Sequence, residues 1–161
     1  MTGRAELRIL HSEIEARAAA TVAAQPSWPC SKGCDHCCRH LAALPTLTPP
    51  EEELLREGIA ALEPETRTEV AARFAALGPS PERPVVCPLL DPASGACLVY
   101  AHRPVACRTY GFYVERDKGL YCGEIERAVA AGECRDVVWG NQAGVEGRMA
   151  GWGPIRTIQF P

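Results

Sequence analysis

Nine cysteines stand in this chain of 161 residues, and four of them fall within one short segment. WPCSKGCDHCCRH, residues 28–40, carries Cys30, Cys34, Cys37 and Cys38 in the spacing C-x3-C-x2-C followed directly by another cysteine. Thiolates two or three residues apart on one turn can point at a single centre, as they do in zinc sites and iron–sulfur clusters. The spacing also matches the cluster loop of radical SAM enzymes, so the metal could be structural or catalytic.

The later cysteines are spread more widely, at Cys87, Cys97, Cys107, Cys122 and Cys134. A zinc site usually shows two C-x2-C pairs, and here only Cys34 and Cys37 have that spacing. The pattern therefore favours a 4Fe–4S cluster over zinc, and zinc stays as the alternative. We expect the side chains of the adjacent Cys37 and Cys38 to diverge, so that one of them serves a second centre or is a spare.

Composition argues against other uses of the thiols. No apolar run approaches the roughly 20 residues that span a bilayer, and the N-terminal segment lacks the apolar core of a signal peptide. We therefore expect a cytoplasmic protein, in which thiols stay reduced and disulfides are disfavoured. A redox pair at Cys34 and Cys37 lacks the surrounding βαβ pattern. The net charge of −3 gives no basic field for nucleic acid, and we expect no membrane partner.

Two arginines and two histidines accompany the cysteines. Four thiolates around zinc or an oxidised cluster leave about two negative charges, which need donors around them. Arg103 and Arg108 stand on either side of Cys107, and we predict that one or both bind and neutralise the cofactor. His36 and His40 are interpreted as solvated residues or outer donors, because thiolates already exceed the ligands required.

The elements that must position these residues are mostly helical. Residues 4–24 carry one apolar stripe, Leu7, Leu10, Ile14, Ala18 and Val22, at helical spacing. A second helix is predicted to begin after Thr48 with Glu51 as its capping-box partner, a third to end at Gly78, and a short fourth to follow Cys122.

Between these helices, residues 85–113 are interrupted by Asp-Pro, Ser-Gly and Arg-Pro, which indicates loops with at most a hairpin around DPASG. The glycine-rich tail, residues 133–161, is expected to wrap the core through Trp139, Trp152 and Phe160 or to be partly disordered. The expected fold is mainly α: one small domain, residues 1–161, of short helices with irregular cysteine-rich loops organised around a metal or cluster.

The segments CSKGCDHCC, CPLLDPASGACLVYAHRPVACRTYGF and CGEIERAVAAG resemble the YkgJ-type cysteine-cluster proteins, the CxxCxxCC family of zinc- or iron-chelating domains. The resemblance covers about residues 30–132, with Tyr100, Arg103, Pro104 and Arg108 as motif companions. It implies metal ligation by eight cysteines, namely Cys30, Cys34, Cys37, Cys38, Cys87, Cys97, Cys107 and Cys122. Cys134 has no counterpart and is interpreted as an extra.

Three functions stay open at this level. The first is a metal-binding protein that carries an iron–sulfur cluster or zinc, in one centre or two, and acts in metal or cluster handling with an unidentified protein partner. The second is a cluster-dependent enzyme such as a SAM-linked methyltransferase, since flagellin lysine N-methylases look related. The chain has neither a barrel's length of βα units nor a glycine-rich nucleotide fingerprint. The third is an interaction module stabilised by zinc.

Overall fold

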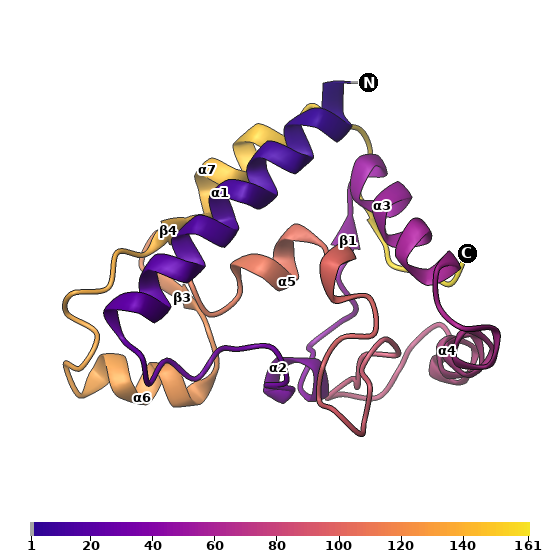
Figure 1. Ribbon diagram of the computed structural model, residues 1–161, viewed down its shortest axis with the longest axis horizontal. Helices are drawn as coiled ribbons and strands as arrows, with labels where there is room; N and C mark the ends of the chain where they lie inside the picture. The colour runs from indigo at the N-terminus through magenta and orange to yellow at the C-terminus, as the bar shows by residue number, and fades with distance from the viewer. Residues whose placement is uncertain (1) are drawn as a thin grey trace. The chain divides into compact units, whose positions relative to one another are not determined.

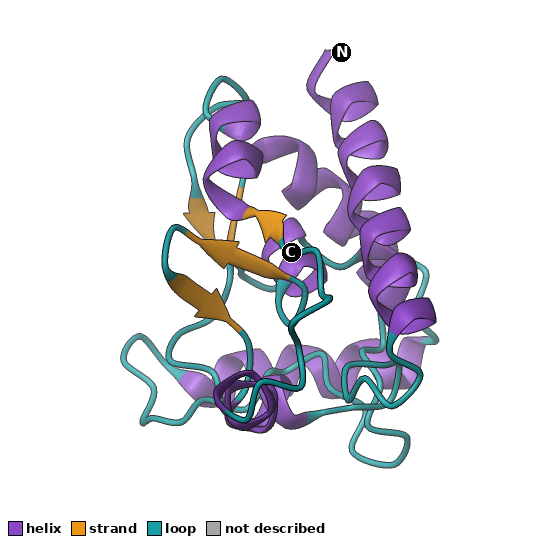
Figure 2. Cartoon of the chain, turned by 90° about the vertical axis from the view of Figure 1, so that its left-hand side faces the viewer, coloured by secondary structure: helices purple, strands orange, loops and turns teal. Residues whose placement is uncertain are grey.

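The computed structural model describes residues 2–161, within which two compact units are distinguished. Unit 1 consists of residues 2–31 and 105–153, and unit 2 consists of residues 32–104 and 154–161. Helices dominate both units and the strands are short, as Figure 2 shows, so the mainly α expectation is confirmed. Across residues 2–161 we find no helix with the length and apolar character that a membrane span requires.

The first helix of unit 1, α1 (Thr2–Ala24), follows the predicted apolar stripe for three turns and then departs from it (Figure 1). Leu7, Leu10 and Ile14 are each 1% exposed. At the end of the stripe Val22 is exposed and Thr21 is buried instead. Steps of 3.6 residues from Leu7 reach position 21 rather than 22, which explains the difference.

The rest of unit 1 is built after residue 104. Helix α5 (Val105–Thr109) packs on α1, and a hairpin of β2 (Tyr113–Glu115) and β3 (Lys118–Leu120) follows it. Strand β4 (Gly140–Asn141) pairs with β2 in parallel, giving the order β3-β2-β4. The prediction of at most one hairpin, around DPASG, was therefore wrong in extent, because β4 adds a third strand from a tail that sequence patterning left unassigned.

Two more helices complete unit 1. Helix α6 (Gly123–Ala130) begins directly after Cys122, as predicted, and α7 (Gln142–Met149) lies in the glycine-rich tail. The tail is joined to α1 by the ion pair of Arg148 with Glu13 and by Trp152, whose indole N–H donates to Glu6 at 2.9 Å. Residues 133–153 of the tail thus form part of unit 1.

Unit 2 holds a helix pair with strong end signals. Helix α3 (Pro49–Ala60) begins with the predicted capping box, in which the Thr48 N–H donates to the Glu51 carboxylate at 2.8 Å. Helix α4 (Pro64–Leu77) ends at Gly78, whose φ of +64° favours glycine. The short helix α2 (His36–Arg39) carries two of the cysteines.

The core of unit 2 joins these helices to the chain's end. Strand β1 (Thr46–Leu47) pairs antiparallel with β5 (Arg156–Thr157), and the 3-10 helix η1 (Tyr100–His102) contacts α3. Phe160 packs on Phe74 of α4 with ring centroids 6.0 Å apart, so the predicted wrapping role of Phe160 is confirmed. The buried members of this core are Leu47, Leu55, Ile59, Val70, Leu89, Val99 and Ile158.

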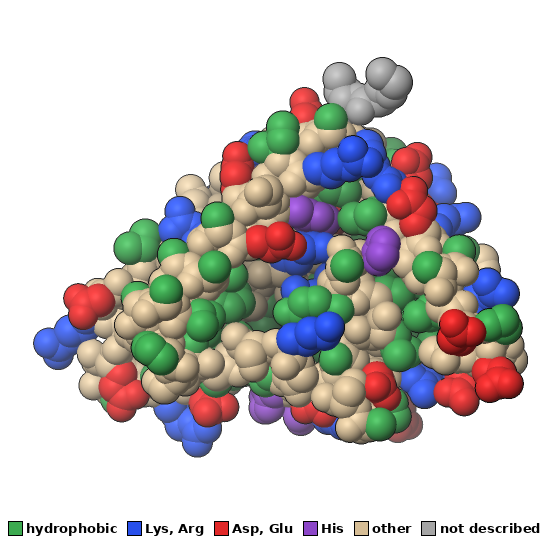
Figure 3. Space-filling view, in the orientation of Figure 1, with side chains coloured by type: hydrophobic (Ala, Val, Ile, Leu, Met, Phe, Trp, Pro, Cys, Tyr) green, Lys and Arg blue, Asp and Glu red, His purple; other side chains and the backbone are tan. Residues whose placement is uncertain are grey.

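Charged side chains are mixed on the face of each unit that Figure 3 shows, with acidic and basic groups interspersed. This distribution agrees with the small net charge of −3. It provides no broad field of one sign on that face.

Candidate metal centre

Two cysteine-bearing segments of unit 2 are joined by backbone pairing. Leu41 and Val85 form an antiparallel bridge with N–H to oxygen distances of 3.1 and 2.8 Å. Beside it, the Cys87 N–H donates to the Cys38 carbonyl oxygen at 2.7 Å. The segment that follows α2 and the segment that begins at Val85 are therefore held in register by the chain itself.

A second turn brings in Cys97. Leu90 and Cys97 form an isolated antiparallel bridge around the DPASG turn, and the Leu98 N–H donates to the Leu89 carbonyl at 2.8 Å. Asp91 shapes this turn, because its side chain accepts from the Ala93 N–H at 3.0 Å. The predicted hairpin around DPASG thus exists as a bridged turn that presents Cys97 near Cys87.

The adjacent cysteines of α2 do not diverge as expected. Their sulfur atoms, Cys37 Sγ and Cys38 Sγ, lie 4.0 Å apart. With Zn–S bonds of about 2.3 Å, two ligands of one tetrahedral ion lie about 3.8 Å apart. The helical turn His36–Arg39 therefore holds this pair at a separation that one ion can bridge.

Three of these thiols share one electrostatic environment. The hydrogen bond with Cys38, followed by burial, raises the pKa of Cys37 far above its usual range. The pKa of Cys87 is raised to about 11, mainly by burial, with smaller contributions from the nearby Cys97 and Cys37 that backbone donors oppose. Burial also raises the pKa of Cys97, where Cys37 again contributes. Each thiolate would be unstable here without a compensating cation.

Arg103 supplies positive charge to this set. Its guanidinium lies over the Tyr100 ring at 3.6 Å from the ring centroid, and its Nε donates to the Tyr100 carbonyl at 3.1 Å. The Arg103 charge opposes the rise in the pKa of Cys97. Lys32, which sequence reasoning missed, also lies against the Tyr100 ring, at 5.0 Å. The prediction for Arg103 gains support from this placement beside Cys97.

The remaining residues of the first cysteine loop lie at the surface. Cys34 is exposed. His36 and His40 stack with ring centroids 4.5 Å apart, and His40 Nδ1 lies 2.7 Å from the His36 carbonyl oxygen. The histidines are engaged with each other and with backbone, in keeping with their interpretation as solvated residues.

Tight glycine contacts hold that loop in place. Gly33 has φ of +98° and Gly95 has φ of +70°, so both favour glycine. A Cβ on Gly95 would lie only 2.5 Å from the Gly33 carbonyl oxygen. This close approach connects the residue before Cys34 to the turn before Cys97.

The other four cysteines belong to unit 1. Cys122 and Cys134 are buried with Trp28 and Ile125 in one cluster, and Cys30 packs against that cluster. Cys107 lies in α5. Arg108, predicted to neutralise a cofactor, is buried in α5 and forms an ion pair with Glu15 of α1.

Metal-binding chemistry fits the donor set, although the thiols have not converged. Within residues 2–161 no three His, Cys, Asp or Glu side chains are arranged to hold one ion. The four unit 2 thiols nevertheless match the number and type of ligands in structural zinc and 4Fe–4S sites. Binding would require rotation of side chains on a backbone that is already paired.

The fold and the site together define a class of protein: a small, mainly helical protein with clustered free thiols. The chain belongs to the CxxCxxCC family, described as a "putative zinc- or iron-chelating domain", whose family model matches residues 29–134. The predicted family is confirmed, and metal chelation is its described property. No curated protein and no solved structure matches the chain.

Proposed function

We propose that this protein binds a metal through cysteine thiolates and that Cys37, Cys38, Cys87 and Cys97 form its principal ligand set. The observation that carries the proposal is that different segments bring these cysteines together: the Cys87 N–H donates to the Cys38 carbonyl oxygen at 2.7 Å, and Cys37 and Cys97 lie near enough to Cys87 to raise its pKa. Cys38 lies 4.0 Å from Cys37 and completes four thiols. Four is the ligand number of both candidate cofactors.

The separation of Cys37 and Cys38 favours one mononuclear ion such as zinc. The two sulfurs already stand near the edge length of a tetrahedral site, whereas in a 4Fe–4S cluster each thiolate binds a different iron and the sulfurs lie farther apart. The cluster is the second candidate, because the wide spacing of Cys87 and Cys97 in the sequence is unlike a pair of C-x2-C zinc motifs.

Arg103 is proposed to balance the charge of this centre. A four-thiolate zinc site carries about two negative charges, and an adjacent guanidinium stabilises the thiolates over the thiols. Arg108 is proposed for the same role toward Cys30, Cys107 and Cys122 in unit 1. The exposed Cys34 is proposed as an accessory ligand that exchanges metal with a partner in metal handling.

Anaerobic purification followed by metal analysis, visible absorption and EPR tests the proposal. A colourless protein with bound zinc supports the mononuclear site, and a brown protein with iron and sulfide supports the cluster. Cys97→Ser should then lose most of the metal of this centre while its far-UV circular dichroism stays helical. A wild-type protein without either metal would contradict the function altogether.

The same sample separates the alternatives of role. Calorimetry with SAM on the metal-loaded protein should show no binding if the protein handles metal, and clear binding would favour the cluster-dependent enzyme. Complete removal of metal should leave unfolded or loosened chains if the centre is structural. A demetallated protein with unchanged melting temperature would contradict the interaction-module alternative.

A further inference from the structure

Cys134, which the sequence marks as an extra cysteine, lies in a buried cluster beside another cysteine. It is 7% exposed and lies in the same buried cluster as Cys122, Trp28 and Ile125. Cys122 stands at the start of α6 and Cys134 lies beyond its end, so this helix and the turn after it carry both thiols into one cluster.

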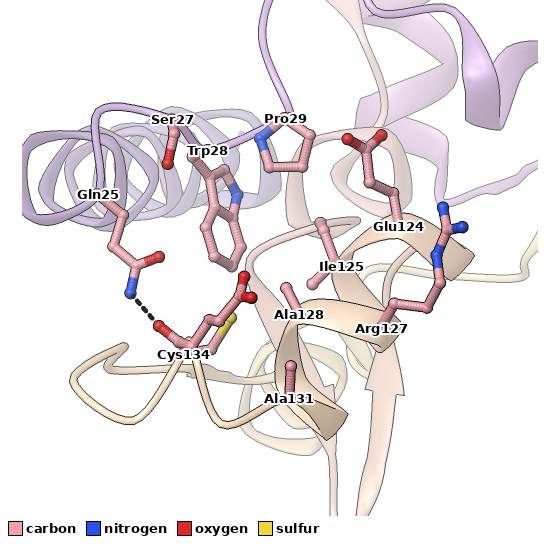
Figure 4. A pocket seen from close by; sticks show the side chains of 11 residues that line it. Gln25, Ser27, Trp28, Pro29, Glu124, Ile125, Arg127, Ala128, Ala131 and Cys134 are labelled. Carbon is pink, nitrogen blue, oxygen red and sulfur yellow. Dashed lines mark hydrogen bonds between the residues drawn. The ribbon is translucent and has the colours of Figure 1, made fainter.

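Local hydrogen bonds fix this arrangement. The Gln25 side-chain N–H donates to the Glu133 carbonyl at 3.0 Å, which joins the end of α1 to the segment carrying Cys134 (Figure 4). The backbone N–H of Trp28 donates to the Gln25 carbonyl at 2.9 Å, which holds Trp28 at the same end of α1. The indole and Cys134 are thus positioned by one set of contacts.

Cys30 also packs against this cluster. Gly111 has φ of +92°, and a Cβ there would lie 2.4 Å from Cys30 Sγ and 3.8 Å from Ile125 Cδ1. The absence of a side chain at Gly111 therefore leaves room for the Cys30 sulfur beside Ile125. Three thiols, Cys30, Cys122 and Cys134, consequently surround the same apolar centre.

Trp28 provides the independent sign of a missing partner. Its side chain is 7% exposed, and its indole Nε1 is buried without a hydrogen-bond partner. A buried, unsatisfied donor costs free energy, so native proteins rarely keep one without reason. A thiolate bound to metal is a strong acceptor for such an N–H, as donors around metal ligands commonly are.

There is also space beside the thiol. A cavity of about 390 Å³ is lined by Trp28, Ile125 and Cys134, with Glu124, Arg127 and Glu133 at its polar parts. Figure 4 shows the indole and the Cys134 sulfur facing this region from different segments. Of the three thiols, Cys134 lines this cavity, and its side chain has room to turn there.

We propose that Cys30, Cys122 and Cys134 form a second, three-thiolate site in unit 1 for a thiophilic divalent cation, with the Trp28 indole N–H donating to one metal-bound sulfur. The inference rests on the proposed function, because it assumes that the cysteines bind metal. Three thiolates leave one position of a tetrahedral ion open, which is where an incoming ligand binds. This open position distinguishes the site from the four-thiolate set of unit 2.

Zinc stoichiometry of the full chain, measured anaerobically with and without a competing chelator, tests the inference. Wild type should bind two equivalents, Cys97→Ser and Cys134→Ser one each, and the double variant Cys97→Ser/Cys134→Ser none. A Cys134→Ser protein that keeps two equivalents, or a double variant that equals Cys97→Ser, would overturn the second site. A wild-type protein that binds no metal would instead overturn the proposed function itself.

A second pair of variants keeps the test independent of Cys134. Trp28→Phe in the Cys97→Ser background should weaken zinc binding about 10- to 100-fold, the range seen when donors around metal ligands are removed. Trp139→Phe is the matched control, since its ring packs on Trp28 with centroids 5.7 Å apart. Equal affinities for the two variants, with cobalt(II) absorption bands unchanged, would remove Trp28 from the site.

Discussion

The backbone N–H of Cys87 donates to the carbonyl oxygen of Cys38 at 2.7 Å, so two cysteines far apart in sequence are neighbours in the sheet-like pairing of unit 2. This bond and the Leu41–Val85 bridge make the approach of the two cysteine segments a property of the apoprotein. Metal binding then has less chain to order, because only the side chains must reorganise.

Gly95→Ala should disturb the metal site from a position that bears no ligand. Its Cβ would lie 2.5 Å from the Gly33 carbonyl oxygen, so the loop before Cys34 must shift. We expect a loss of about 1–3 kcal/mol in unfolding free energy and weaker zinc binding. Gly78→Ala is the control, since φ is also positive but nothing lies within 4 Å. Urea melts should show the larger loss of stability for Gly95→Ala, and chelator competition should show weaker zinc binding for that variant alone. Equal zinc affinities for the two variants would contradict the role of this loop contact.

Loading the protein with zinc near pH 7 should release protons. The pKa values of Cys37, Cys87 and Cys97 are raised, so these thiols are protonated before the metal binds. The four-thiolate centre should release about four protons per ion, because zinc binds thiolates. Titration in a weakly buffered solution with a pH indicator measures the number. A release that is the same in Cys97→Ser would contradict the ligand set.

Demetallated protein should lose stability as the pH rises through the alkaline range. The Cys87 thiol has a pKa of about 11 when folded against an ordinary value of 9.0, so the unfolded chain gives up its proton first. Between pH 9 and pH 11 the unfolding free energy should fall by about 1.4 kcal/mol per pH unit for this thiol. Urea melts with reductant measure the slope, and Cys87→Ser should flatten it. An identical slope in that variant would show that other groups cause the loss.

Arg103→Met should weaken the unit 2 centre without unfolding it. Removing the guanidinium takes away the positive charge beside Cys97 and leaves Lys32 as the cation over the Tyr100 ring. We expect about a tenfold loss of zinc affinity in chelator competition. Arg56→Met, which removes only a surface ion pair with Glu52, serves as the control and should bind zinc normally. Similar affinities for both variants would exclude a role for Arg103.

Glu15→Gln should cost more stability than Glu13→Gln, although both carboxylates lie on α1. Glu15 pairs with Arg108, whose side chain is 4% exposed, whereas Glu13 pairs with the half-exposed Arg148. Loss of a partner leaves a buried charge in one case and a solvated charge in the other. We expect about 1–3 kcal/mol for Glu15→Gln and under about 1 kcal/mol for Glu13→Gln in urea melts. The reverse order would indicate that Arg108 does not depend on Glu15.

The helices were predictable because their signals are local. The Thr48 and Glu51 capping box and the Gly78 stop each depend on a few neighbouring residues, and the structure contains both. The end of the α1 stripe was misassigned by one position, because the helical repeat from Leu7 reaches Thr21 but side-chain polarity favoured Val22. Local patterns therefore predicted where the helices lie, but were less accurate about which residues on each helix are buried.

The sequence predicted that cysteines form the site, but it did not predict which cysteines lie close together. The cysteine spacing pointed to metal, but the approach of Cys38 to Cys87 depends on a bridge between distant segments that have no strand pattern. No sequence signal shows that the indole N–H of Trp28 lacks a hydrogen-bond partner, because that depends on all the groups packed around the ring. Likewise the pairing of β4 with β2 joins a glycine-rich tail to a hairpin by long-range contacts.

The pairing of Cys38 with Cys87 also bears on the entropy of the unfolded chain. A metal that links Cys37 or Cys38 to Cys87 or Cys97 acts as a reversible cross-link around a loop of roughly fifty residues, and closing such a loop restricts the unfolded ensemble by on the order of 4 kcal/mol. That loop contains both α3 and α4. Release of the ion would therefore destabilise two helices that supply no ligand. Metal occupancy would thus control the unfolding free energy of unit 2.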